Sequence, residues 1–155
     1  MKFVSVIGGA SAQSSLLDAA RLLGVELAAC GYGVVCGGMG GVMAAVCQGA
    51  ASRGGVTVGI LPGDKPQEAN PFVGIPIPTG MGSARNRAVV LSGFVVCAID
   101  GGYGTLSEIA FALQAGKPVC VMGEWSKLPG VTPVKTVDEI LAFVREAEGN
   151  RDAKR

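Results

Sequence analysis

The stretch that decides the fold is Phe-Val-Val-Cys-Ala-Ile-Asp-Gly-Gly-Tyr-Gly-Thr-Leu-Ser-Glu, residues 94–108. Its first six residues are apolar, as in a strand that is buried on both faces of a parallel sheet. Gly101, Gly102 and Gly104 then interrupt the apolar run, and helical spacing of apolar residues predicts a helix from Leu106 to Gln114. A strand, a glycine turn and a helix in this order form one unit of an α/β sheet.

The same unit recurs along the chain. The pattern predicts strands at 2–7, 33–36, 56–61, 94–99 and 118–122, and helices at 14–30, 42–52, 83–92, 106–114 and 138–147. Residues 72–78 are bounded by prolines and predict an edge strand. The alternation indicates a Rossmann-like, doubly wound α/β fold with a mostly parallel sheet and helices on both faces. We expect one domain over 1–148 and a frayed polar tail over 149–155.

Composition excludes several classes of function. The net charge is +1 and basic residues are scattered, so we expect no nucleic-acid partner and no anionic membrane partner. The chain has no histidine, which removes Ser-His-Asp chemistry and His-ligated zinc. Residues 27–52 carry no charge, but glycines divide the segment into strand, turn and helix, so we expect no membrane span. The five cysteines stand singly, which indicates buried core thiols in a reducing, cytoplasmic compartment and no metal site.

The glycine turn after residue 99 predicts a phosphate site. Parallel α/β sheets bind ligands beyond the carboxyl ends of their strands, where this turn would lie. Backbone N–H groups at a helix N-terminus, free of side chains, bind an anion, and a threonine hydroxyl adds a further donor. We therefore expect the phosphate to contact Gly101, Gly102, Tyr103, Gly104 and Thr105.

Two more glycine turns are expected at the same edge of the sheet, and each has two interpretations. The first turn either contacts the ligand or simply connects strand to helix tightly; its residues are Gly8, Gly9, Ala10 and Ser11. The second turn has four glycines in five positions, which is more than a turn requires. Either its backbone approaches the ligand at Gly37, Gly38 and Gly40, or Gly41 packs a helix closely on the sheet.

Two charged side chains are candidates for direct roles. Arg85 lies where a loop enters a helix, and its planar guanidinium suits a phosphate or a carboxylate. Arg87 is two positions further on and must point elsewhere. Glu108 has two interpretations: it closes a Thr105-x-x-Glu108 capping box, or its carboxylate faces the sugar or leaving group of a ligand.

The ordered set of these motifs resembles the LOG-like family of Rossmann-type proteins, often labelled lysine decarboxylases. The resemblance is greatest to a short branch of molybdenum-cofactor carrier proteins. It runs through Val6-Ile7-Gly8-Gly9, Gly37-Gly38-Met39-Gly40-Gly41-Val42-Met43, Gly59-Ile60-Leu61-Pro62-Gly63, Gly82-Ser83-Ala84-Arg85-Asn86, Gly101-Gly102-Tyr103-Gly104-Thr105-Leu106-Ser107-Glu108 and Gly116-Lys117-Pro118-Val119.

The resemblance implies two alternative functions. LOG enzymes cleave the N-glycosidic bond of nucleoside 5′-monophosphates such as AMP, and their reacting arginine and glutamate match Arg85 and Glu108. The carrier branch binds a phosphate-bearing pterin cofactor. The enzymes' Met-His-Glu-Arg-Lys motif is absent around Arg85, and Asp100 stands where their proline precedes Gly-Gly-Tyr-Gly-Thr. These departures favour the carrier, whereas nothing in the sequence supports a lysine decarboxylase.

We therefore expect a binding protein for a nucleotide or a pterin phosphate, with the hydrolase as the alternative. The molybdenum cofactor would be its cargo, and it would need no cofactor of its own. The helix-entry motif would contribute Met81, Ser83, Arg85 and Asn86 to the site.

A homodimer or homotetramer is expected, in line with the family. Residues 106–113 are apolar apart from Ser107 and Glu108, and a second copy would bury this face. The alternative is that the closing helix at 138–147 covers it.

Overall fold

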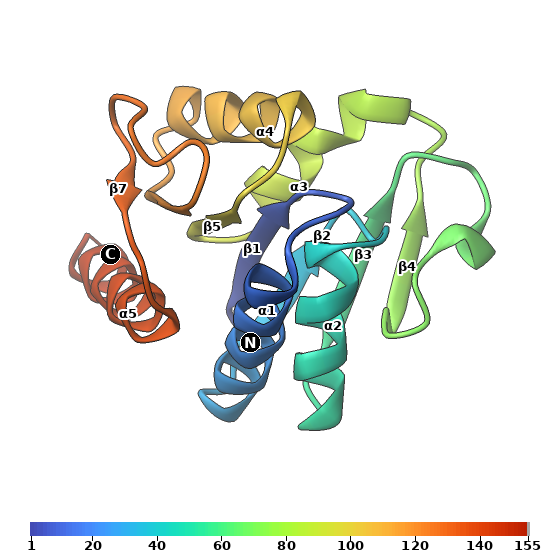
Figure 1. Cartoon of the computed structure of the whole chain (residues 1–155), viewed down its shortest axis with the longest axis horizontal. Helices are drawn as coiled ribbons and strands as arrows, with labels where there is room; N and C mark the ends of the chain where they lie inside the picture. The colour runs from blue at the N-terminus through green and yellow to red at the C-terminus, as the bar shows by residue number, and fades with distance from the viewer. Residues whose placement is uncertain (155) are drawn as a thin grey trace.

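The computed structural model describes residues 1–154 of the chain, and within them seven strands form a single parallel sheet in the order β4-β3-β2-β1-β5-β6-β7 (Figure 1). The strands are β1 (Phe3–Gly8), β2 (Gly33–Cys36), β3 (Thr57–Leu61), β4 (Ile75–Pro78), β5 (Val96–Ile99), β6 (Val119–Met122) and β7 (Thr132–Pro133). The helices are α1 (Ser14–Ala29), α2 (Val42–Ser52), α3 (Asn86–Ser92), α4 (Tyr103–Gln114) and α5 (Val137–Ala153), with short 3-10 turns η1 (Pro66–Glu68) and η2 (Gly82–Arg85).

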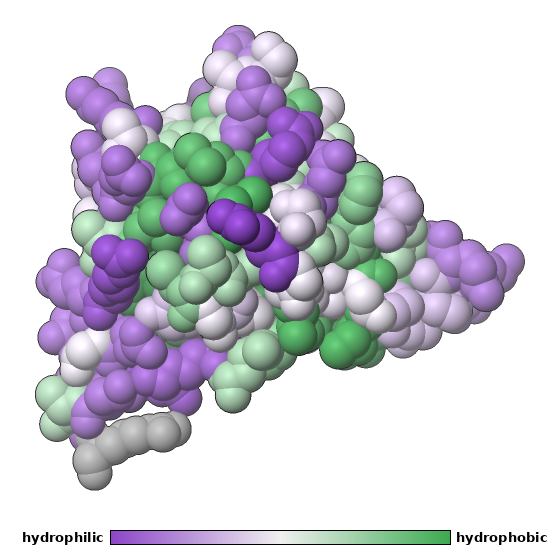
Figure 2. Space-filling view, turned by 90° about the horizontal axis from the view of Figure 1, so that it is seen from below, coloured by the Kyte–Doolittle hydropathy of each residue, from purple (hydrophilic) through white to green (hydrophobic). Residues whose placement is uncertain are grey.

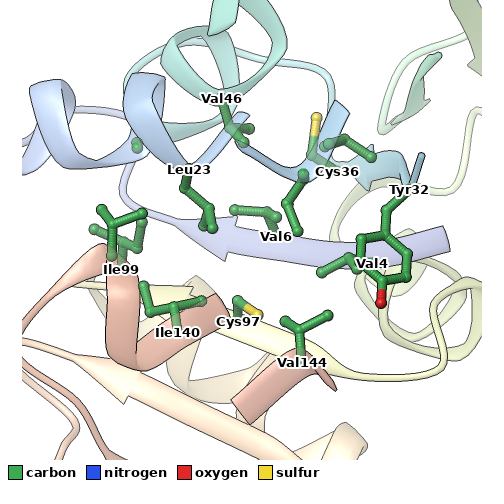
Figure 3. Packing of buried hydrophobic residues seen from close by; sticks show 14 of the residues in the cluster. Val4, Val6, Leu23, Tyr32, Cys36, Val46, Cys97, Ile99, Ile140 and Val144 are labelled. Carbon is green, nitrogen blue, oxygen red and sulfur yellow. The ribbon is translucent and has the colours of Figure 1, made fainter. Parts of the chain in front are cut away.

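The helices lie in two layers because successive strand residues point to opposite faces of the sheet. On β1, Val4 and Val6 pack with α1, α2 and α5, where they meet Leu23 and Val144 (Figure 3). Ile7 points to the other face and packs with α3 and α4. The strand order reverses between β1 and β5, and this is the point at which doubly wound sheets bind ligands.

These features confirm the predicted Rossmann-like α/β fold, including the expected edge position of β4. The predicted helix over 83–92 is divided into η2 and α3. The strand β7 was not predicted, because two residues, one of them a proline, give no period-2 pattern. Helix α4 begins at Tyr103 rather than Leu106.

The prediction of a frayed tail from Gly149 onward is wrong over most of its length. Helix α5 continues to Ala153, and the polar residues of its last turns are exposed. Lys2, which directly precedes β1, forms ion pairs with Glu148 (2.8 Å) and Asp152 (2.7 Å). These ion pairs hold the last turns of α5 to the sheet. Arg155, the last residue of the predicted tail, lies outside the described residues.

The alternative in which the closing helix covers α4 is also wrong. α5 packs with α1 on one face of the sheet, through Ile140 and Val144, whereas α4 lies on the opposite face through Ile109 and Ala112 (Figure 1). The sequence pattern could not distinguish the two faces, because the strands are apolar on both of them. The α4 face that we expected to be covered therefore has no cover from α5.

Backbone packing between α1 and α2 depends on two glycines. A Cβ on Gly24 would lie 2.1 Å from the carbonyl oxygen of Val46, and a Cβ on Gly49 would lie 1.9 Å from that of Arg21. Real Cβ contacts are never so short, so the two helices can be this close only because both residues are glycine. Their closeness fixes the position of the turn that leads into α2.

Four of the five cysteines are buried as predicted, but Cys30 is exposed at the end of α1. Its place there follows from the early end of the helix at Ala29, after which Gly31 (φ +81°) turns the chain, as expected of a C-terminal glycine. Among residues 1–154 no cluster of His, Cys, Asp or Glu could hold a metal ion. No helix in the described chain combines the length and the apolar character that a membrane crossing requires.

Candidate functional site

A cavity of about 250 Å³ opens at the carboxyl ends of β1 and β5, where the strand order reverses. Four segments meet there: the turns after β1 and β5, the start of α2, and the junction of η2 with α3. The cavity is lined by Gly8, Gly9, Ala10, Met43, Arg85, Asn86, Gly102, Gly104, Thr105 and Glu108. Nine of these residues were candidates from sequence, and they come together from segments almost 100 positions apart.

The N-terminus of α4 forms one wall of this cavity. Gly102 is the N-cap, so Tyr103, Gly104 and Thr105 form the first turn, where backbone N–H groups have no partner within the helix. A Cβ on Gly102 or Gly104 would meet no atom within 4 Å. No side chain of Gly102 or Gly104 covers this turn, and both residues line the cavity from which an anion would approach.

The turn after β1 packs against the same wall. A Cβ on Gly8 would lie 2.5 Å from the carbonyl oxygen of Ile99, and one on Gly9 would lie 3.4 Å from the Cα of Gly101. Gly8 is closely packed between β5 and α2, in agreement with the interpretation that this turn connects strand and helix tightly. Gly9 and Ala10 still line the cavity, so contact of this turn with a ligand stays a prediction.

The glycine turn before α2 lies behind the cavity rather than on its wall. A Cβ on Gly41 would lie 2.2 Å from the carbonyl oxygen of Gly9, and one on Gly38 would lie 2.4 Å from the Leu61 side chain. These contacts correspond to the close packing that we gave as the alternative to ligand contact. Gly37 and Gly40 also lie off the cavity wall.

Arg85 reaches into the cavity with one donor unpaired. Its Nη2 donates to the carbonyl oxygen of Gly37 at 3.5 Å, and its Nη1 donates to the Oδ1 of Asn86. The buried Nε has no hydrogen-bond partner in residues 1–154. A buried donor left unpaired lowers stability, so its presence beside an open helix N-terminus indicates a place for an acceptor from a ligand. Arg87 points away as expected, with its guanidinium 6.0 Å from the Phe111 ring centroid.

Asn86 connects two walls of the cavity. It is buried, and its Nδ2 donates to the Oγ of Ser107 at 3.1 Å. The Ser107 hydroxyl in turn donates to the carbonyl oxygen of Gly104 at 2.6 Å. This chain of hydrogen bonds fixes the start of α3, and with it Arg85, relative to the first turn of α4.

Glu108 lies in the second turn of α4, and the capping-box interpretation is wrong. Because the N-cap is Gly102 and no side chain caps the helix, Thr105 is already the third helical residue. Glu108 is only 7% exposed, and its carboxyl forms no hydrogen bond within the described residues. Burial raises the pKa of Glu108 to about 8, against the opposing charge of Arg85. The carboxyl is therefore protonated at neutral pH and lines the cavity.

Several other predicted residues lie outside the wall. Ser11, Met81 and Ser83 are exposed nearby, and Tyr103 is 85% exposed beside Trp125, with ring centroids 6.5 Å apart. Gly101 turns the chain at φ +114°, next to Asp100 at φ +51°. Sequence reasoning missed Met43, although its place at the start of α2, directly after the glycine turn, was the signal that could have found it.

Comparison with known proteins agrees with this architecture. The model of the SLOG cluster4 family matches residues 1–149. The chain belongs to the SLOG cluster4 family. An uncharacterized protein from Archaeoglobus fulgidus is 38% identical over 140 residues, which cover 90% of this chain and 92% of that protein.

Two solved structures are similar in fold and sequence. The molybdenum cofactor binding protein from Rippkaea orientalis has a TM-score of 0.87 and is 34% identical, covering 94% of this chain and 96% of that one. The molybdenum cofactor carrier protein from Chlamydomonas reinhardtii has a TM-score of 0.86 and is 34% identical, covering 96% and 99%. The predicted resemblance to the LOG-like family and its carrier branch is thereby confirmed.

Proposed function

We propose that this member of the SLOG cluster4 family binds the molybdenum cofactor as cargo, through the cofactor's phosphate. The observation that carries the proposal is the juxtaposition of the open first turn of α4 with the unpaired Nε of Arg85. Backbone N–H groups and a guanidinium are the donors that a phosphate prefers. The relatives from Rippkaea orientalis and Chlamydomonas reinhardtii, named for this cofactor, support the choice of ligand.

The size of the cavity limits what it can enclose. Its volume of about 250 Å³ is below the roughly 300–1,000 Å³ of pockets that bury a whole drug-sized ligand. We infer that the cavity takes the phosphate end of the ligand, with Thr105 supplying a hydroxyl, and that the ring system extends outside it. The neutral carboxyl of Glu108 can then donate one hydrogen bond to a ligand oxygen without repelling the phosphate.

Binding is tested with molybdenum cofactor released from a purified molybdoenzyme under anaerobic conditions. After gel filtration, the wild-type protein should retain molybdenum and pterin together, and Arg85→Gln should lose most of both. Arg53→Gln removes the same charge from an exposed position outside the cavity and should retain them. Equal retention by Arg85→Gln and wild type would overturn the proposed role of the cavity.

The second candidate function is hydrolysis of nucleoside 5′-monophosphates, and the buried Glu108 beside Arg85 favours it. In this reaction water attacks C1′ of the ribose and loses a proton, the bond from C1′ to the base breaks, and the base leaves with the electron pair and takes up a proton. A glutamate that is protonated at neutral pH is suited to supply that proton. Arg85 would orient the 5′-phosphate.

The two functions differ in turnover. Purified protein is incubated with AMP and with N6-prenylated AMP, and free base is measured by chromatography. Base release that vanishes in Glu108→Gln would establish the hydrolase. Absence of release above the level of this variant, while AMP still binds, would leave the carrier function.

A further inference from the structure

A second cavity, of about 640 Å³, lies at the opposite end of the sheet, where β5 and β6 begin. It is lined by Leu91, Ser92, Gly93, Phe94, Gly116, Lys117, Pro118, Phe143, Glu146, Ala147, Asn150, Arg151 and Lys154. Strands β1 and β4 point upward in Figure 1, and Figure 2, which views the molecule from below, shows apolar surface beside strongly hydrophilic residues. No residue lines both this cavity and the one at the glycine turns.

Part of the wall of this second cavity is apolar, and two of its residues are aromatic. Phe94 closes one side, and the guanidinium of Arg151 lies 5.8 Å from its ring centroid. Phe143 and Pro118 contribute further apolar surface. The volume lies within the roughly 300–1,000 Å³ that is usual for small-molecule sites, and such sites combine apolar walls with a few polar groups.

The polar groups of the cavity carry an excess of positive charge. Three cations line it against the single acid Glu146. The Nζ of Lys117 donates to the carbonyl oxygens of Leu91 (3.2 Å) and Gly93 (2.5 Å), so part of its donor capacity is used. Within residues 1–154, Arg151 and Lys154 form no ion pair.

These cations also repel one another. Burial, and secondarily the charge of Arg151, lower the pKa of Lys117. Lys117 has a structural role, because it binds carbonyl oxygens at the end of α3. That role does not explain why Arg151 and Lys154 line the same cavity. An anion between these groups would relieve the repulsion and supply the missing partner.

We propose that this cavity is a binding site for a small aromatic anion, a planar ring that carries a sulfonate, carboxylate or phosphate group. The ring would pack against Phe143 and Pro118, and the anionic group would pair with Arg151 and Lys154. The site is separate from the cavity at the glycine turns and does not depend on the function proposed for it.

The probe is anilinonaphthalene sulfonate, an aromatic anion whose fluorescence rises in an apolar site. It is titrated into the wild-type protein, into the double variant Arg151→Gln/Lys154→Gln and into Arg85→Gln. The matched control is Arg53→Gln/Lys127→Gln, which removes two charges from exposed residues outside both cavities. Thermal unfolding of each variant verifies that it is folded, and amide shifts in nitrogen-15 spectra of Gly93, Gly116 and Asn150 locate the dye.

We expect saturable binding of one dye per chain to the wild type, to Arg85→Gln and to the control. The double variant should bind roughly tenfold more weakly, because it lacks both charges that pair with the anionic group. Equal affinity of the double variant and the wild type would overturn the proposal. So would loss of binding in Arg85→Gln, or amide shifts confined to Gly102 and Gly104, since either would place the dye at the glycine turns.

Discussion

The guanidinium of Arg85 occupies space that is open only because residue 37 is glycine. A Cβ on Gly37 would lie 2.7 Å from Nη2 of Arg85 and 2.9 Å from Sδ of Met43. The carbonyl oxygen of the same Gly37 accepts a hydrogen bond from that Nη2. The turn before α2 therefore shapes the site without lining it, by setting how Arg85 enters the cavity.

Gly37→Ala should displace Arg85 and weaken phosphate binding about tenfold or more, since one charge-assisted contact contributes about 1.5–3 kcal/mol. The φ angle of Gly37 is not in the left-handed region, so the alanine can be accommodated by the backbone. Gly40→Ala is the matched control, because its Cβ would lie 3.5 Å from the nearest atom. Calorimetric titration with AMP checks both variants, and equal weakening in Gly40→Ala would contradict the explanation.

Glu108 should make the protein less stable as the pH rises. Its pKa is raised from 4.5 to about 8 in the folded protein, so between these values the folded state binds the extra proton. Stability from this group is fully present below pH 4.5 and is lost as the pH rises through about 8. The loss should amount to a few kcal/mol, because one pKa unit corresponds to about 1.4 kcal/mol.

Urea unfolding of wild type and Glu108→Gln across this pH range measures the effect. Glutamine cannot ionise, so the variant should lack this decrease and equal or exceed the wild type at the upper end. Glu146→Gln, an exposed position, should keep the wild-type slope. A decrease of the same size in Glu108→Gln would assign the pH dependence to another group.

The order of elements and the location of the cavity at the glycine turns could be predicted because both follow from local patterns. Apolar strands alternating with glycine turns define a parallel sheet, and the sheet brings the turns after Gly8 and Asp100 to one edge. The burial of Glu108 could not be predicted, because it depends on where α4 starts. Thr105 suggested a cap, but the glycines before it allow the helix to start at Tyr103.

The sequence also did not indicate which helices pack on which face of the sheet. The strands are apolar on both faces, so no periodicity indicated that α5 packs with α1 and leaves α4 uncovered. The second cavity arises from the same placement of α5. Its cations come from Lys117 and from the last turns of α5, a part of the chain whose polar sequence suggested a tail.

The uncovered α4 leads to a prediction about assembly. We expect a homodimer or homotetramer that buries the outer side of α4, so light scattering should give a multiple of 15.6 kDa. Ala110 is exposed on this helix, and Ala110→Lys should shift the mass to that of one chain. Ala142→Lys places the same charge on the exposed side of α5 and should leave the assembly intact. A wild-type mass of one chain would contradict the prediction.

The contact between α1 and α2 leads to a further expected loss of stability. Gly24→Ala and Gly49→Ala place a methyl group against backbone carbonyl oxygens, which cannot rotate away as a side chain would. The two helices must separate, and overpacking of this kind costs about 1–3 kcal/mol or more. Gly149→Ala is the matched control within a helix, because a Cβ there meets no atom within 4 Å and alanine favours the helix by about 1 kcal/mol. Chemical unfolding should therefore show opposite signs for the two kinds of substitution. If Gly24→Ala proved as stable as the wild type, the close backbone contact would not be a determinant of the fold.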